Sequence, residues 1–337
     1  MSNSPDFVTL KSDDFEYGEV QQIAPNIRRI IAKNPSKFSY HGTGTYIVGT
    51  GDVAVIDPGP RIDSHRDAIS AALAGETVRS ILVTHCHADH SPLAAWLRDE
   101  TGALTVAFGP HDRPGAEPWD IGSDPEGFGI VPPGSGDSAA QPDDIAEPDV
   151  KIEEATDHEF TPDIAVATGD VAVSGDGWSI TALHTPGHTS NHTCFALDDG
   201  TTRTLFTGDH VMGWSTTVVS PPDGDMNDYF ESLRVVAGRD DDIAIPTHGV
   251  PIPNPQRFVR QLIAHREARE QQIVDAVRGG LTTIPDIVTT LYAAVRVELH
   301  KPAARSVLSH IVKLVDDGVL AHDGAGRPRL DSVYAAG

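Results

Sequence analysis

Residues 80–90 read SILVTHCHADH, a short apolar run followed at once by three histidines and an aspartate. The apolar part predicts a buried strand. The polar part cannot pack as core, because four polar side chains would all need hydrogen-bond partners there. Imidazole nitrogens and carboxylate oxygens are ligands that zinc, iron and manganese accept. The stretch therefore predicts a metal-binding loop at the end of a strand.

The spacing within this loop indicates two groups of ligands. His85 and His87 are two residues apart, so both side chains can point to one side of an extended turn. Asp89 and His90 stand where the next predicted helix begins and can point to a second place. One loop can therefore supply ligands to two ions.

Three more residues of the ligand type each follow a predicted strand. His188 follows residues 178–183, Asp209 follows 204–207, and His248 follows 243–246. In α/β scaffolds such positions carry much of the chemistry. We expect one ion to be held by His85, His87 and His188, and the other by Asp89, His90 and His248. Asp209 would bridge them, since a carboxylate bridge suits two divalent ions about 3.5–4 Å apart.

This ligand pattern resembles that of the metallo-beta-lactamase superfamily over roughly residues 40–250. The resemblance implies an α/β fold, a four-layer αββα sandwich with two metals at one edge. Zinc is the expected metal, with iron or manganese as alternatives. The antibiotic-destroying branches usually carry a cysteine where this chain has Asp209, which argues against beta-lactamase activity. Asp57, in the VIDPG run at 55–59, matches an early family motif and is expected to support the ligands.

Composition divides the chain into two domains, 1–255 and 256–337. The first would be catalytic and contains an acidic insertion, residues 112–170, with 16 acidic and 2 basic residues. This insertion is either a solvated surface segment or a lid over the site. The second begins with a long helix from Pro255 and continues as helices at 284–295 and 303–317 and a strand pair at 318–322 and 327–330.

That order of elements is typical of a winged helix, and the tail resembles the C-terminal domain of a metallo-beta-lactamase subgroup. The subgroup includes a mitochondrial endoribonuclease and many bacterial hydrolases. From Arg257 onward the chain has 11 basic and 9 acidic residues and no dense basic stripe. A plain helical packing or dimerisation appendage is therefore favoured over nucleic-acid binding.

Overall composition excludes several classes of protein. The 337 residues include 49 acidic and 25 basic ones, which gives a net charge of −24. This charge disfavours a nucleic-acid substrate but leaves it as an alternative. Two cysteines cannot form a disulfide framework, and the N-terminus has no basic or apolar leader. No run of residues is apolar enough for a membrane span. We expect a cytoplasmic protein, for which a homodimer is compatible with the sequence.

The function predicted from these residues is metal-assisted hydrolysis of a small carbonyl substrate: an ester, thioester, lactone or lactam. Asp89 would orient a metal-bridging hydroxide and move its proton. His192 is either a proton donor to the leaving group, a support for the ligands, or a strand residue with a satisfied hydrogen bond. The alternatives are a metal-dependent endoribonuclease or phosphodiesterase, and a metal-containing regulatory protein without catalytic activity.

Overall fold

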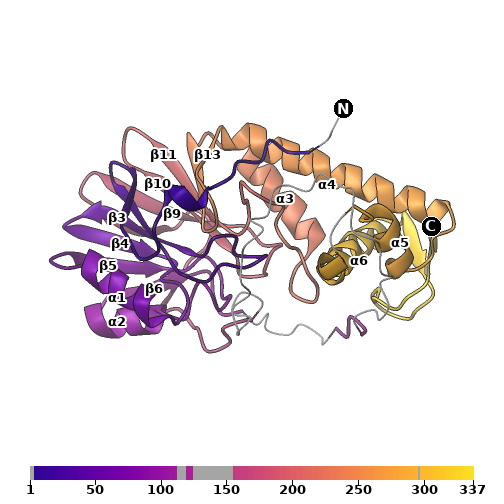
Figure 1. Ribbon diagram of the computed structural model, residues 1–337, viewed down its shortest axis with the longest axis horizontal. Coiled ribbons are helices and arrows are strands. Elements are labelled where there is room, and N and C mark those ends of the chain that lie inside the picture. Colours follow the sequence, from indigo (N-terminus) through magenta and orange to yellow (C-terminus); the bar gives the residue numbers. More distant parts are fainter. Residues whose placement is uncertain (1–3, 112–118, 124–154, 295–296) are drawn as a thin grey trace.

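The computed structural model describes residues 4–111, 119–123, 155–294 and 297–337, and its larger part consists of two stacked sheets flanked by helices (Figure 1). The described strands of the first sheet pair in chain order. They are β1 (Gln21–Ala24), β2 (Ile27–Ile31), β3 (Gly44–Thr50), β4 (Asp52–Ile56), β5 (Thr77–Leu82), β6 (Leu104–Ala107) and β7 (Ile164–Ala165). Strands β1 to β4 are antiparallel, whereas β4 to β7 pair in parallel.

The second sheet has the order β13-β12-β11-β10-β9-β8 over the described residues. Its strands are β8 (Val171–Gly175), β9 (Trp178–His184), β10 (Thr193–Asp198), β11 (Arg203–Gly208), β12 (Ile243–Pro246) and β13 (Ile252–Pro253). Only β11 and β12 among these pairs run in parallel. Parallel pairs such as β4–β5 and β11–β12 place their carboxyl ends side by side, which brings the loops that follow them together.

Side-chain alternation along β4 shows how the layers are held. Val53 and Val55 face a cluster shared with helices α1 (Asp63–Ala72) and α2 (Ala94–Thr101). Ala54 and Ile56 face the opposite way, into a cluster shared with the second sheet. Helices α3 (Met226–Ala237) and α4 (Pro255–Arg278) cover the outer face of that second sheet. The result is the αββα sandwich that the sequence predicts.

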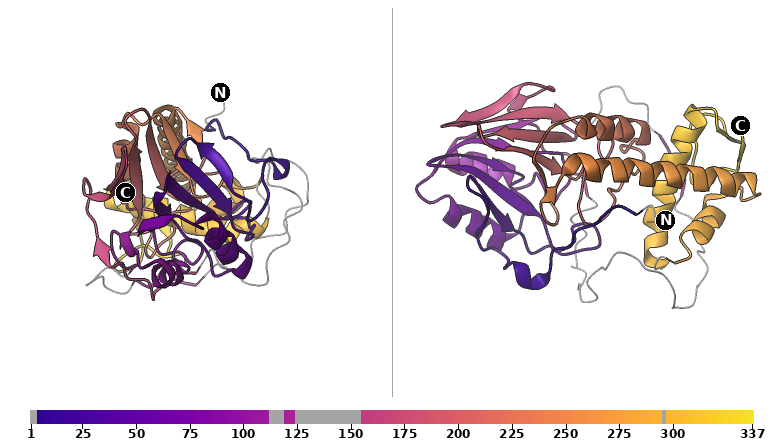
Figure 2. Two further views of the ribbon diagram at one scale, coloured as in Figure 1. Left: turned by 90° about the vertical axis from the view of Figure 1, so that its left-hand side faces the viewer. Right: turned by 90° about the horizontal axis from the view of Figure 1, so that it is seen from above.

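The C-terminal part is a small helical unit beside the sandwich, reached through the long helix α4 (Figure 2). Its elements are α5 (Ile284–Leu291), the 3-10 turn η2 (Val297–Leu299), α6 (His300–Asp316), β14 (Leu320–His322) and β15 (Tyr334–Ala336); a further 3-10 turn, η1, spans Ser12–Asp14. The first turns of α4 contribute Phe258 and Leu262 to the core under the second sheet. Its last turns contribute Ile273 and Val277 to the core of the C-terminal unit. One helix therefore fixes the two parts to each other.

The winged-helix hairpin differs from the prediction in its second strand. The sequence predicts a strand at 327–330, but β14 pairs with residues 334–336. Pro328 has no backbone N–H to donate to a ladder. Leu330 is buried, and its N–H donates to the carbonyl of Ile121 at 2.8 Å. The predicted helix at 284–295 is also shorter, since α5 ends at Leu291.

Most of the acidic insertion, residues 112–118 and 124–154, lies outside the described residues. The predicted lid or solvated segment therefore falls outside them as well. Of the insertion's described residues, 119–123 contribute Trp119 and Ile121 to the core of the C-terminal unit, whereas 155–170 include the sheet strand β7. In the described part of the chain, no helix combines the length and apolarity needed to cross a membrane.

Candidate metal centre

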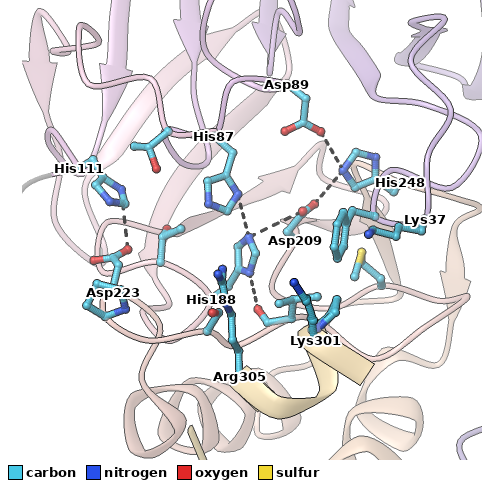
Figure 3. Close-up of a pocket in the computed structure, with 18 of the residues that line it drawn as sticks. Lys37, His87, Asp89, His111, His188, Asp209, Asp223, His248, Lys301 and Arg305 are labelled. Atoms are coloured by element: carbon cyan, nitrogen blue, oxygen red, sulfur yellow. Dashed lines mark hydrogen bonds and ion pairs between the residues drawn. The ribbon is translucent and has the colours of Figure 1, made fainter. Parts of the chain in front are cut away.

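The predicted ligands meet at one edge of the sandwich because each follows a strand that ends there. The loop after β5 carries His85, His87, Asp89 and His90, while Asp209 directly follows β11. Gly208 makes this possible, since it has a positive φ of +50° and a Cβ there would lie 2.6 Å from Nε2 of His192. Figure 3 shows the ligand side chains of His87, Asp89, His188, Asp209 and His248 converging from these loops.

The first predicted triad is assembled around Nδ1 of His87. This nitrogen lies 3.0 Å from Nε2 of His85 and 3.2 Å from Nε2 of His188. The other nitrogen of His188 is also held, since Nδ1 donates to the carbonyl of Val218 at 2.6 Å. Three imidazole nitrogens that point at one another at hydrogen-bond distance are a set of donors suited to a cation.

The second predicted triad lies beside the first. Nε2 of His248 is 3.3 Å from Oδ2 of Asp89, and Nε2 of His90 is 3.4 Å from Oδ1 of Asp89. Nδ1 of His248 donates to the carbonyl of Gly42 at 3.1 Å, so its Nε2 lone pair is the one that faces the centre. All three side chains are buried.

Asp209 stands between the triads with one oxygen toward each. Oδ2 is 3.8 Å from Nε2 of His188, and Oδ1 is 3.4 Å from Nε2 of His248 and 3.7 Å from Nε2 of His90. Both Oδ1 of Asp209 and Nε2 of His90 are buried without a hydrogen-bond partner. Buried polar atoms rarely lack partners, so these orphaned atoms fit a centre that holds cations.

Asp57 holds ligand side chains in place by hydrogen bonds and does not line the cavity. Its carboxylate accepts hydrogen bonds from Nδ1 of His90 at 2.9 Å, from the N–H and hydroxyl of Thr84 at 2.8 Å each, and from the hydroxyl of Thr247 at 2.9 Å. Because the Thr84 hydroxyl donates to Asp57, it accepts from Nδ1 of His85 at 3.1 Å. One carboxylate thereby fixes the orientation of a ligand in each triad.

The charges of the site fit metal binding. Burial, followed by the neighbouring histidines, holds the pKa of His85 well below its ordinary value, and burial lowers that of His87 to about 3. These imidazoles are therefore neutral, as ligands must be. For His248 burial acts against protonation, but the negative charges of Asp209 and Asp89 raise the pKa to about 10. The carboxylates of Asp89 and Asp209 thus favour a positive charge at this place.

His192 lies behind Asp209, not among the residues that line the cavity. The backbone N–H of Asp209 donates to its Nε2 at 3.2 Å, so its Nδ1 donates to the hydroxyl of Thr185 at 2.9 Å. The side chain is fully buried, and burial, with neighbouring histidines, lowers its pKa well below the usual value. With both nitrogens engaged, the imidazole directs no N–H into the cavity. This placement disfavours the proton-donor interpretation.

The two cysteines are buried away from the ligand sets. Cys86 accepts a hydrogen bond from the amide of Asn191 at 2.8 Å, and burial raises the pKa of its thiol to about 12. Cys194 is likewise buried, with a thiol pKa of about 12. Both thiols are protonated at neutral pH and pack as small side chains.

A cavity of about 660 Å³ opens over the ligands. Besides His87, Asp89, His188, Asp209 and His248, its lining includes residues that sequence reasoning did not select: Lys37, Phe38, His111, His158, Asp223, Lys301 and Arg305. His111 and Asp223 lie together on one side, with Nδ1 3.7 Å from Oδ2 (Figure 3). No local pattern marks these residues, because they come from loops and a helix that only the tertiary fold brings to one place.

The ligand geometry fits a metal centre, and comparison with known proteins gives the class of the protein. The model of the metallo-beta-lactamase superfamily matches residues 41–248, and the chain belongs to this superfamily. The model of the beta-lactamase associated winged helix domain matches residues 283–327, as the tail of the sequence predicts. The chain is accordingly a hydrolase of the metallo-beta-lactamase fold with a C-terminal winged helix.

Relatives of similar length match most of the chain. The lactamase-like protein ptaB of Pestalotiopsis fici is 26% identical over 316 residues, covering 90% of this chain and 84% of the relative. An atrochrysone carboxyl ACP thioesterase of Aspergillus chevalieri is 28% identical over 323 residues, covering 91% and 87%. Among solved structures, a metallo-beta-lactamase family protein from Thermus thermophilus shares the fold with a TM-score of 0.66 at 20% identity, covering 94% of this chain and 100% of that one.

Proposed function

We propose that this protein is a two-metal hydrolase that cleaves a thioester of a small carboxylic acid. The observation that carries the proposal is the placement of Asp209, whose two oxygens face different ligand triads on the floor of one cavity. A single-metal site would need neither the second triad nor the bridge. Donor chemistry favours zinc as the metal, because imidazole and carboxylate donors suit it best, and iron or manganese also accept them.

The ligand sets have distinct tasks. His85, His87 and His188 would hold one ion, Asp89, His90 and His248 the other, and Asp209 both. Two divalent ions bound there supply Lewis acidity and a water molecule that is easily deprotonated. The protein's own share is to keep the imidazoles neutral, fix their orientation through Asp57, and exclude bulk water from the buried face of the site.

Asp89 is the proposed proton acceptor of the reaction. Its Oδ2 accepts a hydrogen bond from the hydroxyl of Thr43 at 3.0 Å, which orients the carboxylate at the cavity wall. Attack of water on the thioester carbonyl forms a C–O bond, Asp89 takes the proton of that water, and the C–S bond then breaks. The products are a carboxylic acid and a thiolate, which takes up the proton.

A thioester suits the arrangement of the buried histidines. A thiol has a pKa near 8.5, so the thiolate leaves without prior protonation. This fits His192 behind Asp209, where it positions the backbone of the bridging residue and gives no proton. Relatives named as ACP thioesterases, similar over about nine-tenths of this chain, support the same substrate class.

The proposed catalytic unit comprises residues 1–255, and the winged-helix unit comprises residues 256–337. Helix α4 belongs to both cores, so separating the units at residue 255 exposes apolar surface on each side. The intact chain is therefore the form to assay.

The test is thioester hydrolysis by the purified chain, followed through release of free thiol, together with elemental analysis. We expect two divalent ions per chain, and turnover that a chelator abolishes and added zinc or manganese restores. A short single-stranded RNA serves as the competing substrate, since an endoribonuclease of the same fold would cleave it. Metal-loaded protein that cleaves RNA but no thioester would overturn the proposal, and so would full activity with one ion per chain.

A further inference from the structure

The cavity gathers cationic side chains although the protein as a whole is strongly acidic. The whole chain has a net charge of −24, yet three cationic side chains, Lys37, Lys301 and Arg305, line the cavity. Its lining carboxylates are Asp89 and Asp209, which belong to the ligand sets, and Asp223. The acidic composition of the chain does not account for these three cations, so we expect them to have a role at the cavity.

Lys301 and Arg305 come from the C-terminal unit. They are four residues apart in the first turns of α6, so they project from the same face of the helix. Figure 3 shows both on the helix segment beside His188, with Lys37 reaching in near His248. The side that holds His111 and Asp223 lies across the cavity (Figure 3).

The helix that carries these residues is firmly placed. Ala304, Leu308 and Ile311 of α6 are buried in the C-terminal core. The ammonium group of Lys313 in α6 lies over the ring of Phe230 in α3, which ties the helix to the other domain. Arg266 of α4 donates to the carbonyl of Thr217. The two cations are therefore held against the cavity by packing between the domains.

Lys37 is positioned by a hydrogen-bonded loop between β2 and β3. The hydroxyl groups of Ser36 and Ser39 lie 3.0 Å apart, and the N–H of Phe38 donates to the Ser36 hydroxyl at 3.0 Å. The amide of Asn34 donates to the hydroxyl of Thr43, just before β3. The loop therefore has a defined shape at the point where Lys37 and Phe38 enter the cavity lining.

We propose that Lys37, Lys301 and Arg305 form an anion-binding subsite that receives a carboxylate or phosphate group carried by the substrate. Guanidinium and ammonium groups recognise these anions through charge-assisted hydrogen bonds, which are stronger in a partly enclosed cavity than on an open surface. The inference rests on the proposed thioester hydrolysis and narrows it to substrates with an anionic group away from the scissile bond. It makes the winged-helix domain part of the substrate site.

The anion has two sources, and a set of three substrates distinguishes them. The neutral reference is the butyryl thioester of N-acetylcysteamine. The succinyl thioester of the same thiol adds a carboxylate to the acyl part, and butyryl-coenzyme A adds phosphates to the thiol part. We expect kcat/KM of the wild type to be roughly tenfold or more higher for one of the charged substrates than for the neutral one.

The variants Lys37→Gln, Lys301→Gln and Arg305→Gln should each lower that ratio, mainly through KM. Arg278→Gln is the matched control, since Arg278 is an exposed arginine at the end of α4 that does not line the cavity. An equal loss with Arg278→Gln would mean a general charge effect and would overturn the subsite. A wild type without any preference for charge would overturn it as well.

Failure of the proposed function is recognised separately. If metal-loaded wild type cleaves none of the three thioesters, calorimetric binding of the corresponding thioethers, which cannot be hydrolysed, gives the same comparison without turnover. Tighter binding of a charged thioether that is lost in Arg305→Gln supports the subsite in an enzyme of another reaction. Binding that is indifferent to charge rejects it.

Discussion

Asp57 accepts a hydrogen bond from Nδ1 of His90 at 2.9 Å, and both side chains are fully buried. Because this carboxylate can only accept, the proton of the imidazole is held on Nδ1 and the Nε2 lone pair is directed toward Asp89 and Asp209. The same carboxylate binds Thr84 and Thr247, which lie next to ligands on two different loops. Asp57 therefore supports residues that follow strands of both sheets.

Replacement of Asp57 by Asn should weaken the second metal position. An amide can donate to Nδ1 of His90 and would turn the protonated Nε2 toward the metal. We expect metal affinity to fall by roughly 10–100-fold, as is usual for groups behind the ligands. A chelator titration that follows bound metal measures this. Asp67→Asn, an exposed change on α1, is the control. Equal resistance of Asp57→Asn and wild type to the chelator would contradict the role.

Replacement of Asp209 by Ala should remove the bridge between the triads. We expect fewer than two ions per chain and a loss of turnover far beyond the roughly 10–100-fold of a supporting residue. Elemental analysis and thioester assays measure both, and circular dichroism verifies the fold. Asp223→Ala, which removes a lining carboxylate outside both triads, should keep the full metal content. An Asp209→Ala protein with two ions and normal turnover would disprove the bridging assignment.

His192→Ala separates positioning from proton donation. The variant loses the acceptor for the N–H of Asp209, so we expect kcat to fall by about 10–100-fold. The pKa values read from the pH profile of kcat should stay where they are in wild type, because the imidazole gives no proton to the substrate. Loss of one limb of the profile would instead identify His192 as a general acid.

His65 should make the protein less stable in acid. Its Nε2 donates to the hydroxyl of Thr45, which itself donates to the carbonyl of Asp57, and burial lowers the pKa of His65 to about 4. An unfolded histidine takes up its proton near pH 6.5, so between pH 6.5 and 4 the unfolded chain binds more protons than the folded one. Stability therefore falls as the pH falls through this window, by up to about 3 kcal/mol from this group.

Chemical denaturation at about pH 7.5, 6 and 5 measures that effect. The free energy of unfolding of His65→Gln should depend less on pH than that of wild type, whatever its absolute value. His322→Gln, on the partly exposed hairpin strand β14, should keep the wild-type slope. Equal slopes for His65→Gln and wild type would rule out the contribution of His65.

The sequence was sufficient to select the side chains that the fold brings together, because each predicted ligand is marked locally. A polar cluster such as residues 84–90 directly after an apolar strand has no structural explanation other than a site, and His188, Asp209 and His248 repeat that placement. Periodicity likewise predicted α4, whose apolar residues return every three or four positions. It failed at the second strand of the hairpin, where the proline at 328 and the burial of Leu330 outweighed local preference.

Only the tertiary structure assigned roles that depend on what lies next to a side chain. His192 is of a residue type, and at a distance from His188 in the sequence, that suit a catalytic role. The fold, however, places Asp209 between it and the cavity. Lys37, Lys301 and Arg305 share no motif, since the first stands far from the other two in the sequence and in a different domain. Sequence periodicity reports which face of an element is buried, whereas a binding site depends on which elements face each other. That arrangement is fixed by packing between the sheets, α3, α4 and α6.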